Sequence, residues 1–167
     1  MKIVWFRIDD RFVHGQVTVA WTKISNANTI WVVNDSIAKN PVLRQLQISL
    51  APPGTAVEVF TVDDAIKKLQ EETNASDNKR VLLIVSNPID ALKLIEAGAK
   101  VEFINVGQMA WKRGREKIDK TVSVTPEEAA ACKKIAEMGV KLLYQQLPDF
   151  PPKPEDFIEK LKKKGLI

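Results

Sequence analysis

The chain has 167 residues, a length that fits one domain with a sizeable core. Its composition, 45% hydrophobic and 28% charged, is ordinary for a soluble protein, and no apolar run is long enough for a membrane span. One cysteine excludes an internal disulfide framework, and the N-terminus lacks a signal-peptide pattern, so we expect a cytoplasmic protein. The net charge of +4 comes from dispersed basic residues without a nucleic-acid module, so nucleic acid is not the expected partner.

Short β-branched runs alternate with helical patterns along the chain. Buried strands are predicted over residues 2–8, 29–34, 56–60, 80–86, 101–106, 120–124 and 140–145. Helices are predicted over residues 16–24, 40–51, 62–72, 87–98 and 125–139. This order indicates an α/β fold: an open, doubly wound, largely parallel sheet of about seven strands, flanked by helices on both faces.

The chain changes character after residue 147. Residues 147–154, LPDFPPKP, predict a Pro-rich linker, and residues 155–167 predict a short amphipathic helix. Phe157, Ile158 and Leu161 of that helix are expected to pack against the body. We therefore assign residues 1–147 to one domain and residues 148–167 to a linker and helix packed on it.

The only histidine, His14, lies in RIDDRFVHGQV, directly after the first predicted strand. Ligands of open α/β sheets bind beyond the carboxyl ends of strands, and a helix starting near Gly15 would direct its free N–H groups there. His14 could carry a phosphoryl group on a ring nitrogen while Arg11 pairs with a phosphate oxygen. Asp9 or Asp10 could hold the other ring nitrogen. A capping histidine beside a local ion pair is equally compatible with this position.

Other chemistries find less support in the residues. One histidine and one cysteine supply too few nitrogen and sulfur ligands for a typical metal site, so we expect no bound metal. The GxSxG, GxxxxGK[ST] and GxGxxG motifs do not occur. The nearest rival is a receiver-type phosphoaspartate domain, because paired aspartates follow the first strand. That class needs an acceptor aspartate at the end of the third strand, where Thr61 stands and Asp63 comes two residues late.

RIDDRFVHGQV closely resembles RIDDRLIHGQV, the active-site signature of IIB subunits in the mannose/fructose/sorbose family of sugar phosphotransferase systems. WVVNDSIAKNPVLRQLQISLAPPG and FINVGQMAWKRGREKIDKTVSVTPEE resemble further segments of that family, so the similarity covers residues 1–147. The resemblance implies that His14 accepts a phosphoryl group from phosphohistidine of a IIA partner. His14 would then pass it to a hexose bound by the membrane components IIC and IID during uptake. The protein would thus be a cytoplasmic phosphotransferase subunit, peripherally associated with that membrane complex.

The resemblance also implies residue roles. Arg11 would contact the phosphoryl group and Asp9 would support the loop, while the role of Asp10 stays open. From the residues alone, the N–H groups at Gly15 and Gln16 could stabilise the phosphoryl oxygens. No cofactor is expected beyond the transient phosphoryl group on His14.

Two other sets of residues need an interpretation. Cys132 lies on a predicted helix away from the His14 loop and is expected to be a small core or boundary residue, not the phosphocysteine that unrelated IIB families use. Trp111, Lys112, Arg113 and Arg115 follow the strand at 101–106 and are candidates for docking a partner, although an ordinary surface loop would look the same. Three hypotheses follow: a phosphotransferase using His14, a receiver-like module, or a basic interaction protein.

Overall fold

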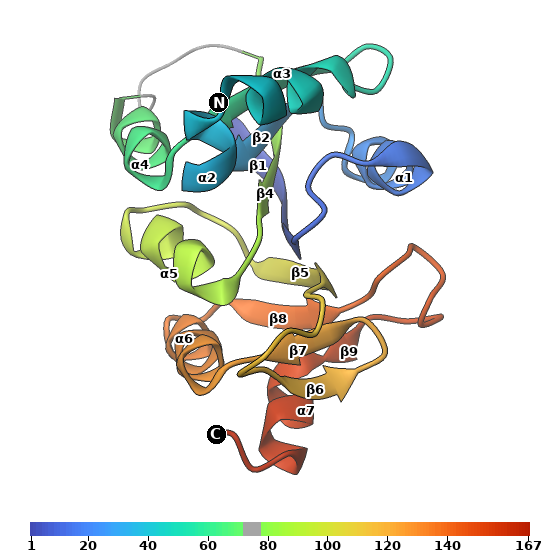
Figure 1. The fold of residues 1–167 in the computed structure, drawn as a ribbon, viewed down its shortest axis with the longest axis vertical. Coiled ribbons are helices and arrows are strands. Elements are labelled where there is room, and N and C mark those ends of the chain that lie inside the picture. Colours follow the sequence, from blue (N-terminus) through green and yellow to red (C-terminus); the bar gives the residue numbers. More distant parts are fainter. Residues whose placement is uncertain (72–77) are drawn as a thin grey trace.

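Seven strands form the central sheet, in the order β3-β2-β4-β1-β5-β8-β9 (Figure 1). The computed structural model describes residues 1–71 and 78–167. The strands are β1 (Lys2–Asp9), β2 (Thr29–Val33), β3 (Ala56–Phe60), β4 (Arg80–Val85), β5 (Phe103–Gln108), β8 (Lys141–Tyr144) and β9 (Glu155–Asp156). Neighbouring strands run parallel except for β9, which pairs antiparallel with β8. The predicted fold class is confirmed.

Helices cover both faces of this sheet. They are α1 (Gly15–Ser25), α2 (Asp35–Lys39), α3 (Pro41–Ser49), α4 (Val62–Glu71), α5 (Pro88–Glu96), α6 (Pro126–Glu137) and α7 (Phe157–Lys163). Side chains from α1, α2 and α3 pack in one core cluster, and those from α4 to α7 pack in the other. Figure 1 shows α4, α5 and α6 stacked on one side of the sheet and α1 on the other. This division follows from right-handed crossovers that run in opposite directions from β1 and β4.

The continuous apolar runs in the sequence reflect burial on both faces. Along β2, Trp31 and Val33 belong to one core cluster, whereas Ile30 and Val32 belong to the other. A strand covered by helices on both sides has no solvent-facing position, so polar residues do not alternate with apolar ones along it.

The run at 120–124 does not join the main sheet, as its prediction among the buried strands implied. It forms β7 (Val122–Val124), which pairs antiparallel with β6 (Glu116–Asp119) in a separate two-stranded sheet. Val122 and Val124 are buried in the core, which accounts for the apolar pattern of this run. An apolar pattern predicts burial but does not reveal which strand is the pairing partner. The seventh strand of the main sheet is β9, from a segment that was predicted to be linker and helix.

Two predicted helices begin at different residues in the structure, in each case directly after a capping side chain. The predicted helix at 40–51 is α3, which starts after Asn40, whose side chain accepts from the N–H groups of Val42 and Leu43. The C-terminal helix is shorter than predicted, because Asp156 caps it directly after β9. Residue 72, in the predicted helix 62–72, lies outside the described residues. Phe157 and Leu161 of α7 are fully buried, so this helix contributes to the main core. Among the described helices, none is long and apolar enough to cross a membrane.

Candidate functional site

The loop between β1 and α1, residues 10–14, lies at the carboxyl edge of the sheet where strand connections diverge. The chain leaves β1 towards α1 on one face, whereas the neighbouring strands β4 and β5 lead to α5 and α6 on the other. Such a topological switch point leaves a crevice between the loops, and α/β proteins bind ligands there. The predicted placement of the His14 loop is therefore correct.

A buried carboxylate organises this loop. Asp9, the last residue of β1, has no exposed surface. Its Oδ2 accepts from Arg7 Nη2 at 3.0 Å and from Arg11 Nη2 at 3.0 Å. Its Oδ1 accepts from Arg11 Nε at 3.1 Å and from the Arg11 backbone N–H at 3.0 Å. Asp9 thus fixes both the backbone and the guanidinium of Arg11, a bidentate geometry that lysine cannot reproduce.

Arg7 is a site residue that the sequence analysis missed. Its side chain is only 2% exposed, and burial lowers its pKa to about 10, although Asp9 opposes this shift. The guanidinium also donates to the Asn105 side chain and to the carbonyls of Gln145 and Gln146. The sequence did contain a signal, because Arg7 and Asn105 each lie within a predicted buried strand. Buried polar side chains need hydrogen-bond partners, so two of them in one sheet are candidates to pair.

The Arg7 side chain lies between an aromatic ring and a glycine. Its guanidinium carbon is 5.0 Å from the centroid of the Trp21 ring. On β5, a Cβ at Gly107 would overlap the guanidinium, so only glycine leaves room for it. Arg7 therefore compensates the charge of Asp9 from a position that neither solvent nor a partner can reach.

His14 is the N-cap residue of α1, and both of its ring nitrogens face the protein. Nδ1 lies 2.7 Å from the Phe12 carbonyl, which can only accept, so Nδ1 carries the hydrogen and Nε2 carries the lone pair. Nε2 is 3.9 Å from Asp9 Oδ2, too far for a hydrogen bond, and is buried without a hydrogen-bond partner among the described residues. The Phe12 carbonyl, not an aspartate as expected, therefore sets the tautomer.

The environment keeps this imidazole neutral at physiological pH. Burial is the main cause that lowers the pKa of His14, and the positive charges of Arg11 and Arg7 lower it further. Asp9 and the bond to Phe12 act in the opposite direction without reversing the shift. A neutral imidazole has a lone pair, which a nucleophile requires.

Backbone contacts hold the loop around His14. The Val13 N–H donates to Gln47 Oε1 on α3 at 2.8 Å, and the His14 N–H donates to Thr18 Oγ1 on α1 at 2.9 Å. Helix α1 has no side-chain cap and no acidic residue in its first turn. The exposed Gly15 and Gln16 thus begin a helix whose own first turn supplies no carboxylate to its positive end.

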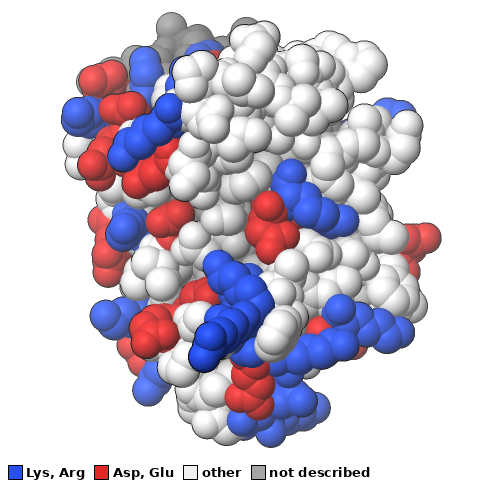
Figure 2. Space-filling view, in the orientation of Figure 1, with Lys and Arg blue, Asp and Glu red and all other residues white. Residues whose placement is uncertain are grey.

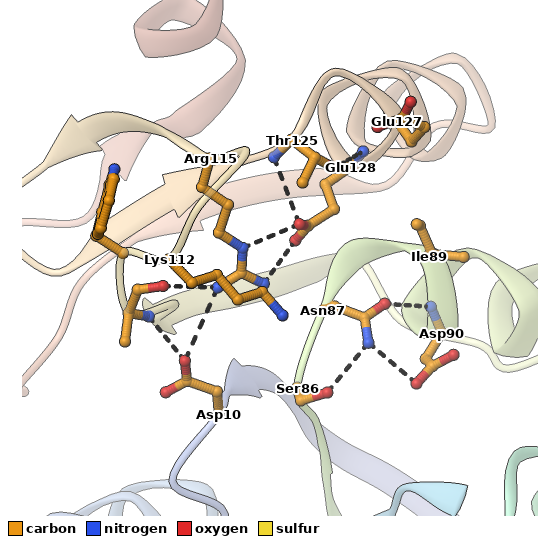
Figure 3. Close-up of a pocket in the computed structure, with 12 residues that line it drawn as sticks. Asp10, Ser86, Asn87, Ile89, Asp90, Lys112, Arg115, Thr125, Glu127 and Glu128 are labelled. Atoms are coloured by element: carbon orange, nitrogen blue, oxygen red, sulfur yellow. Dashed lines mark hydrogen bonds and ion pairs between the residues drawn. The ribbon is translucent and has the colours of Figure 1, made fainter.

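Asp10 connects the loop to the opposite side of the crevice. Its Oδ2 accepts from the Ala110 N–H at 2.7 Å and lies 4.0 Å from Arg115 Nη1. Arg115 in turn forms a bidentate pair with Glu128 on α6 and donates to the Ala110 carbonyl (Figure 3). Asp10, whose role the sequence left open, thus joins the His14 loop to residues 110–115.

These contacts form one wall of a pocket of about 570 Å³. Figure 3 shows it between the Asp10 side and the N-terminal ends of α5 and α6, lined further by Asn87, Asp90 and Lys112. Asn87 caps α5 and also donates to Asp90, and burial raises the pKa of that aspartate. His14 and Arg11 do not line this pocket, so it lies beside the loop.

The four docking candidates differ in their accessibility. Trp111 is 66% exposed, and Lys112 and Arg113 are exposed beside it. Arg115 is only 8% exposed, because both edges of its guanidinium are occupied by Glu128 and Ala110. The expectation that Arg115 contacts a partner is therefore wrong, and its role is to hold the loop.

Metal binding and thiol chemistry are the two remaining possibilities. Within residues 1–71 and 78–167, no cluster of three or more His, Cys, Asp or Glu side chains is arranged to hold a metal ion. Cys132 is fully buried on α6, and its pKa is raised, chiefly by burial and then by Glu128. A buried, protonated thiol is unreactive, so Cys132 is a core residue as expected.

The fold and the polar cluster define a doubly wound α/β domain with a histidine loop at its switch point. Residues 3–166 match the family model described as the PTS system sorbose subfamily IIB component, where PTS denotes the phosphotransferase system. The chain belongs to this family. Its members are components of sugar phosphotransferase systems.

Individual relatives agree with this assignment. The fructose-specific EIIB component of Bacillus subtilis (strain 168) is 36% identical over 162 residues, which cover 97% of each chain. The mannose-specific EIIAB component of Escherichia coli (strain K12) is 37% identical over 164 residues, covering 98% of this chain and 50% of that protein. The crystal structure of the IIBSor domain of the sorbose permease from Klebsiella pneumoniae has a TM-score of 0.91 and 31% identity, covering 98% of both chains.

Proposed function

We propose that His14 is the phosphoryl acceptor of this IIB component. A phosphohistidine of a IIA partner is the donor, and a hexose of the mannose/fructose/sorbose class, bound by membrane components IIC and IID, is the final acceptor. The observation that carries the proposal is the buried Asp9 carboxylate, which fixes Arg11 beside a neutral His14. In the EIIAB relative the name itself includes a IIA part, which supports a IIA donor.

The proposed transfer needs positioning and charge neutralisation. The lone pair of the His14 imidazole forms a bond to phosphorus while the P–N bond of the donor breaks, and the donor imidazole leaves with that electron pair. Arg11, whose side chain is partly exposed, uses Nε and Nη2 for Asp9, which leaves Nη1 for a phosphoryl oxygen. The N–H groups at Gly15 and Gln16 supply further donors. In the second step the sugar hydroxyl attacks phosphorus while the P–N bond to His14 breaks, and the leaving imidazole, which keeps that electron pair, can accept the hydroxyl proton. Neither step requires a metal or an organic cofactor.

The ring of His14 has to turn before it reacts. Nε2 is buried against Asp9, and Nδ1 is occupied by the Phe12 carbonyl. Rotation about the side-chain bonds brings a nitrogen to the surface and replaces the Phe12 bond with contacts to the phosphoryl group. The described conformation therefore represents the resting acceptor, in which the nucleophile is protected from solvent.

The test is phosphorylation by radiolabelled phospho-IIA, with the product located by mass spectrometry. We expect one acid-labile, base-stable phosphoryl group on His14, none in His14→Ala, and normal labelling in the control Cys132→Ala. Labelling of His14→Ala would refute the proposal. A base-labile product would instead indicate an aspartyl phosphate and the receiver-like alternative.

Association with the membrane is a separate part of the proposal. The chain would be cytoplasmic and would bind peripherally to IIC and IID. Vesicles that contain IIC and IID should therefore bind the protein and, with phospho-IIA, take up and phosphorylate the sugar. Omission of either membrane component should abolish sugar phosphorylation while leaving His14 labelled.

A further inference from the structure

Helix α3 buries a glutamine and leaves several apolar residues exposed, while its Ile48 packs partly buried against the core. Its only buried residue is Gln47, whereas Val42, Leu43 and Leu46 are 76%, 38% and 50% exposed. Leu50, which caps the helix, is 42% exposed. These four residues, here called the apolar face of α3, are spaced so that they gather on one side of the helix. A surface helix normally turns such a stripe towards the core, so this stripe calls for a partner.

The apolar face of α3 is physically joined to the His14 loop. Gln47 turns inward, where its Oε1 accepts from the Val13 N–H at 2.8 Å. Its Nε2 is 3.5 Å from the Val13 carbonyl. Val13 is the residue before His14, so the helix that presents the stripe also fixes the position of the acceptor loop. A partner that covers His14 with an interface of ordinary size, about 800 Å² on each side, therefore extends over α3.

Charge is distributed unevenly around this loop. Residues 41–50 contain Arg44 as their only charged residue. Figure 2 shows a broad uncharged area over α3 and blue residues gathered lower on the same face. The exposed Lys112 and Arg113, beside Trp111, belong to the segment between β5 and β6. Figure 1 shows this segment below the β1–α1 connection and α3 above it. The complementary partner thus has an apolar patch next to an acidic one.

We propose that the apolar face of α3 is the docking surface for the phosphoryl donor, a IIA domain with an apolar patch flanked by acidic residues. This inference rests on the proposed function of His14. Cytoplasmic loops of membrane proteins carry an excess of Lys and Arg, so a face that combines apolar and basic residues suits a soluble acidic donor better. A second copy of this chain docked on α3 would cover the His14 loop and block transfer.

The test uses Leu46→Glu with Met138→Glu as its matched control. Both parent side chains are 50% exposed, but Met138 ends α6, whose opposite end reaches the crevice. The rate of His14 phosphorylation is measured against the concentration of phospho-IIA. We expect Leu46→Glu to raise the half-saturating concentration by about ten-fold or more, as loss of a central apolar contact does. The maximal rate should be unchanged, and Met138→Glu should behave like the wild type.

Phosphoramidate, a small donor that needs no docking surface, separates docking from chemistry. Leu46→Glu and wild type should accept a phosphoryl group from it at equal rates, and their melting curves should agree. If neither donor labels His14 in the wild type, the proposed function fails and the docking surface fails with it. If His14 is labelled but Leu46→Glu saturates like wild type, only the docking surface is wrong.

Two further outcomes would reassign the apolar face of α3. Sedimentation that detects a wild-type dimer, lost in Leu46→Glu, would assign the face to self-association. Normal saturation with phospho-IIA, combined with lost sugar phosphorylation in vesicles containing IIC and IID, would assign it to the membrane components. Either result overturns the assignment to the donor.

Discussion

Replacing Asp9 with asparagine tests the charge arrangement on which the loop depends. The carboxylate accepts from Arg7 through Oδ2 and from Arg11 through both oxygens. Asparagine has nearly the same shape but presents an NH₂ group in place of one oxygen. In either orientation that group faces guanidinium or backbone donors, so hydrogen bonds are lost and the charge of Arg7 has no counterion.

The magnitude follows from burial. Arg7 and Asp9 are 2% and 0% exposed, and removing one partner from such a buried pair costs about 3–5 kcal/mol of unfolding free energy. The Arg11 side chain is 34% exposed, so solvent screens its charge and its lost pair adds at most about 1 kcal/mol. In a chain of this size, Tm falls by about 2–4 °C for each kcal/mol of lost unfolding free energy. The loss from the Arg7–Asp9 pair therefore corresponds to a decrease of about 6–20 °C in Tm.

Urea unfolding and calorimetry measure this effect, with Asp10→Asn as the control. Asp10 is the neighbouring carboxylate, and an asparagine there keeps an oxygen for its one hydrogen bond, to the Ala110 N–H. We expect the control to lose less than about 1 kcal/mol, the usual size for a surface pair. If Asp9→Asn also stays within that range, then Arg7 does not depend on Asp9 and the charge arrangement is wrong.

Two further predictions concern His14 and Gly107. Because its pKa is lowered in the folded state, His14 binds fewer protons than in the unfolded chain between that lowered pKa and 6.5. Stability should therefore rise with pH across this window, His14→Asn should lack that contribution, and phosphoryl acceptance should fall only below 6.5. A Gly107→Ala methyl group would overlap the Arg7 guanidinium, so we expect a loss of about 1–3 kcal/mol in urea unfolding. An unchanged unfolding midpoint would show that Arg7 can move aside at no cost.

The sequence locates the His14 loop because two independent signals coincide there. The first apolar run ends at Asp9, and a helical pattern begins near Gly15, so the polar residues between them have to lie at a carboxyl edge. Alternation of strands and helices defines the parallel sheet for the same reason. Both inferences depend on local spacing, which the chain carries in its order of residues.

The spacing of apolar and polar residues does not identify contacts between residues that are distant in the sequence. The segment WKRGREK suggests that Arg115 is a surface residue, but Arg115 is buried because it pairs with Glu128 on α6. Arg7 looks like an interruption of a strand until Asn105, almost a hundred residues later, lies beside it. The apolar run at 120–124 likewise does not state which strand it pairs with. In each case the missing information is a contact between distant segments, and no local pattern specifies it.

If His14 is the acceptor as proposed, the charges around it account for both acceptance and release of the phosphoryl group. Arg7 and Arg11 carry positive charges, Asp9 carries one negative charge between them, and the neutral imidazole adds none. This leaves one net positive charge, whereas a bound phosphoryl group adds about two negative charges. Without Asp9, the buried charge of Arg7 would add to that of Arg11, and the stronger positive field would favour retention over onward transfer. Asp9 would therefore do more than support the loop: by compensating the charge of Arg7, it would limit the attraction to the free guanidinium edge of Arg11.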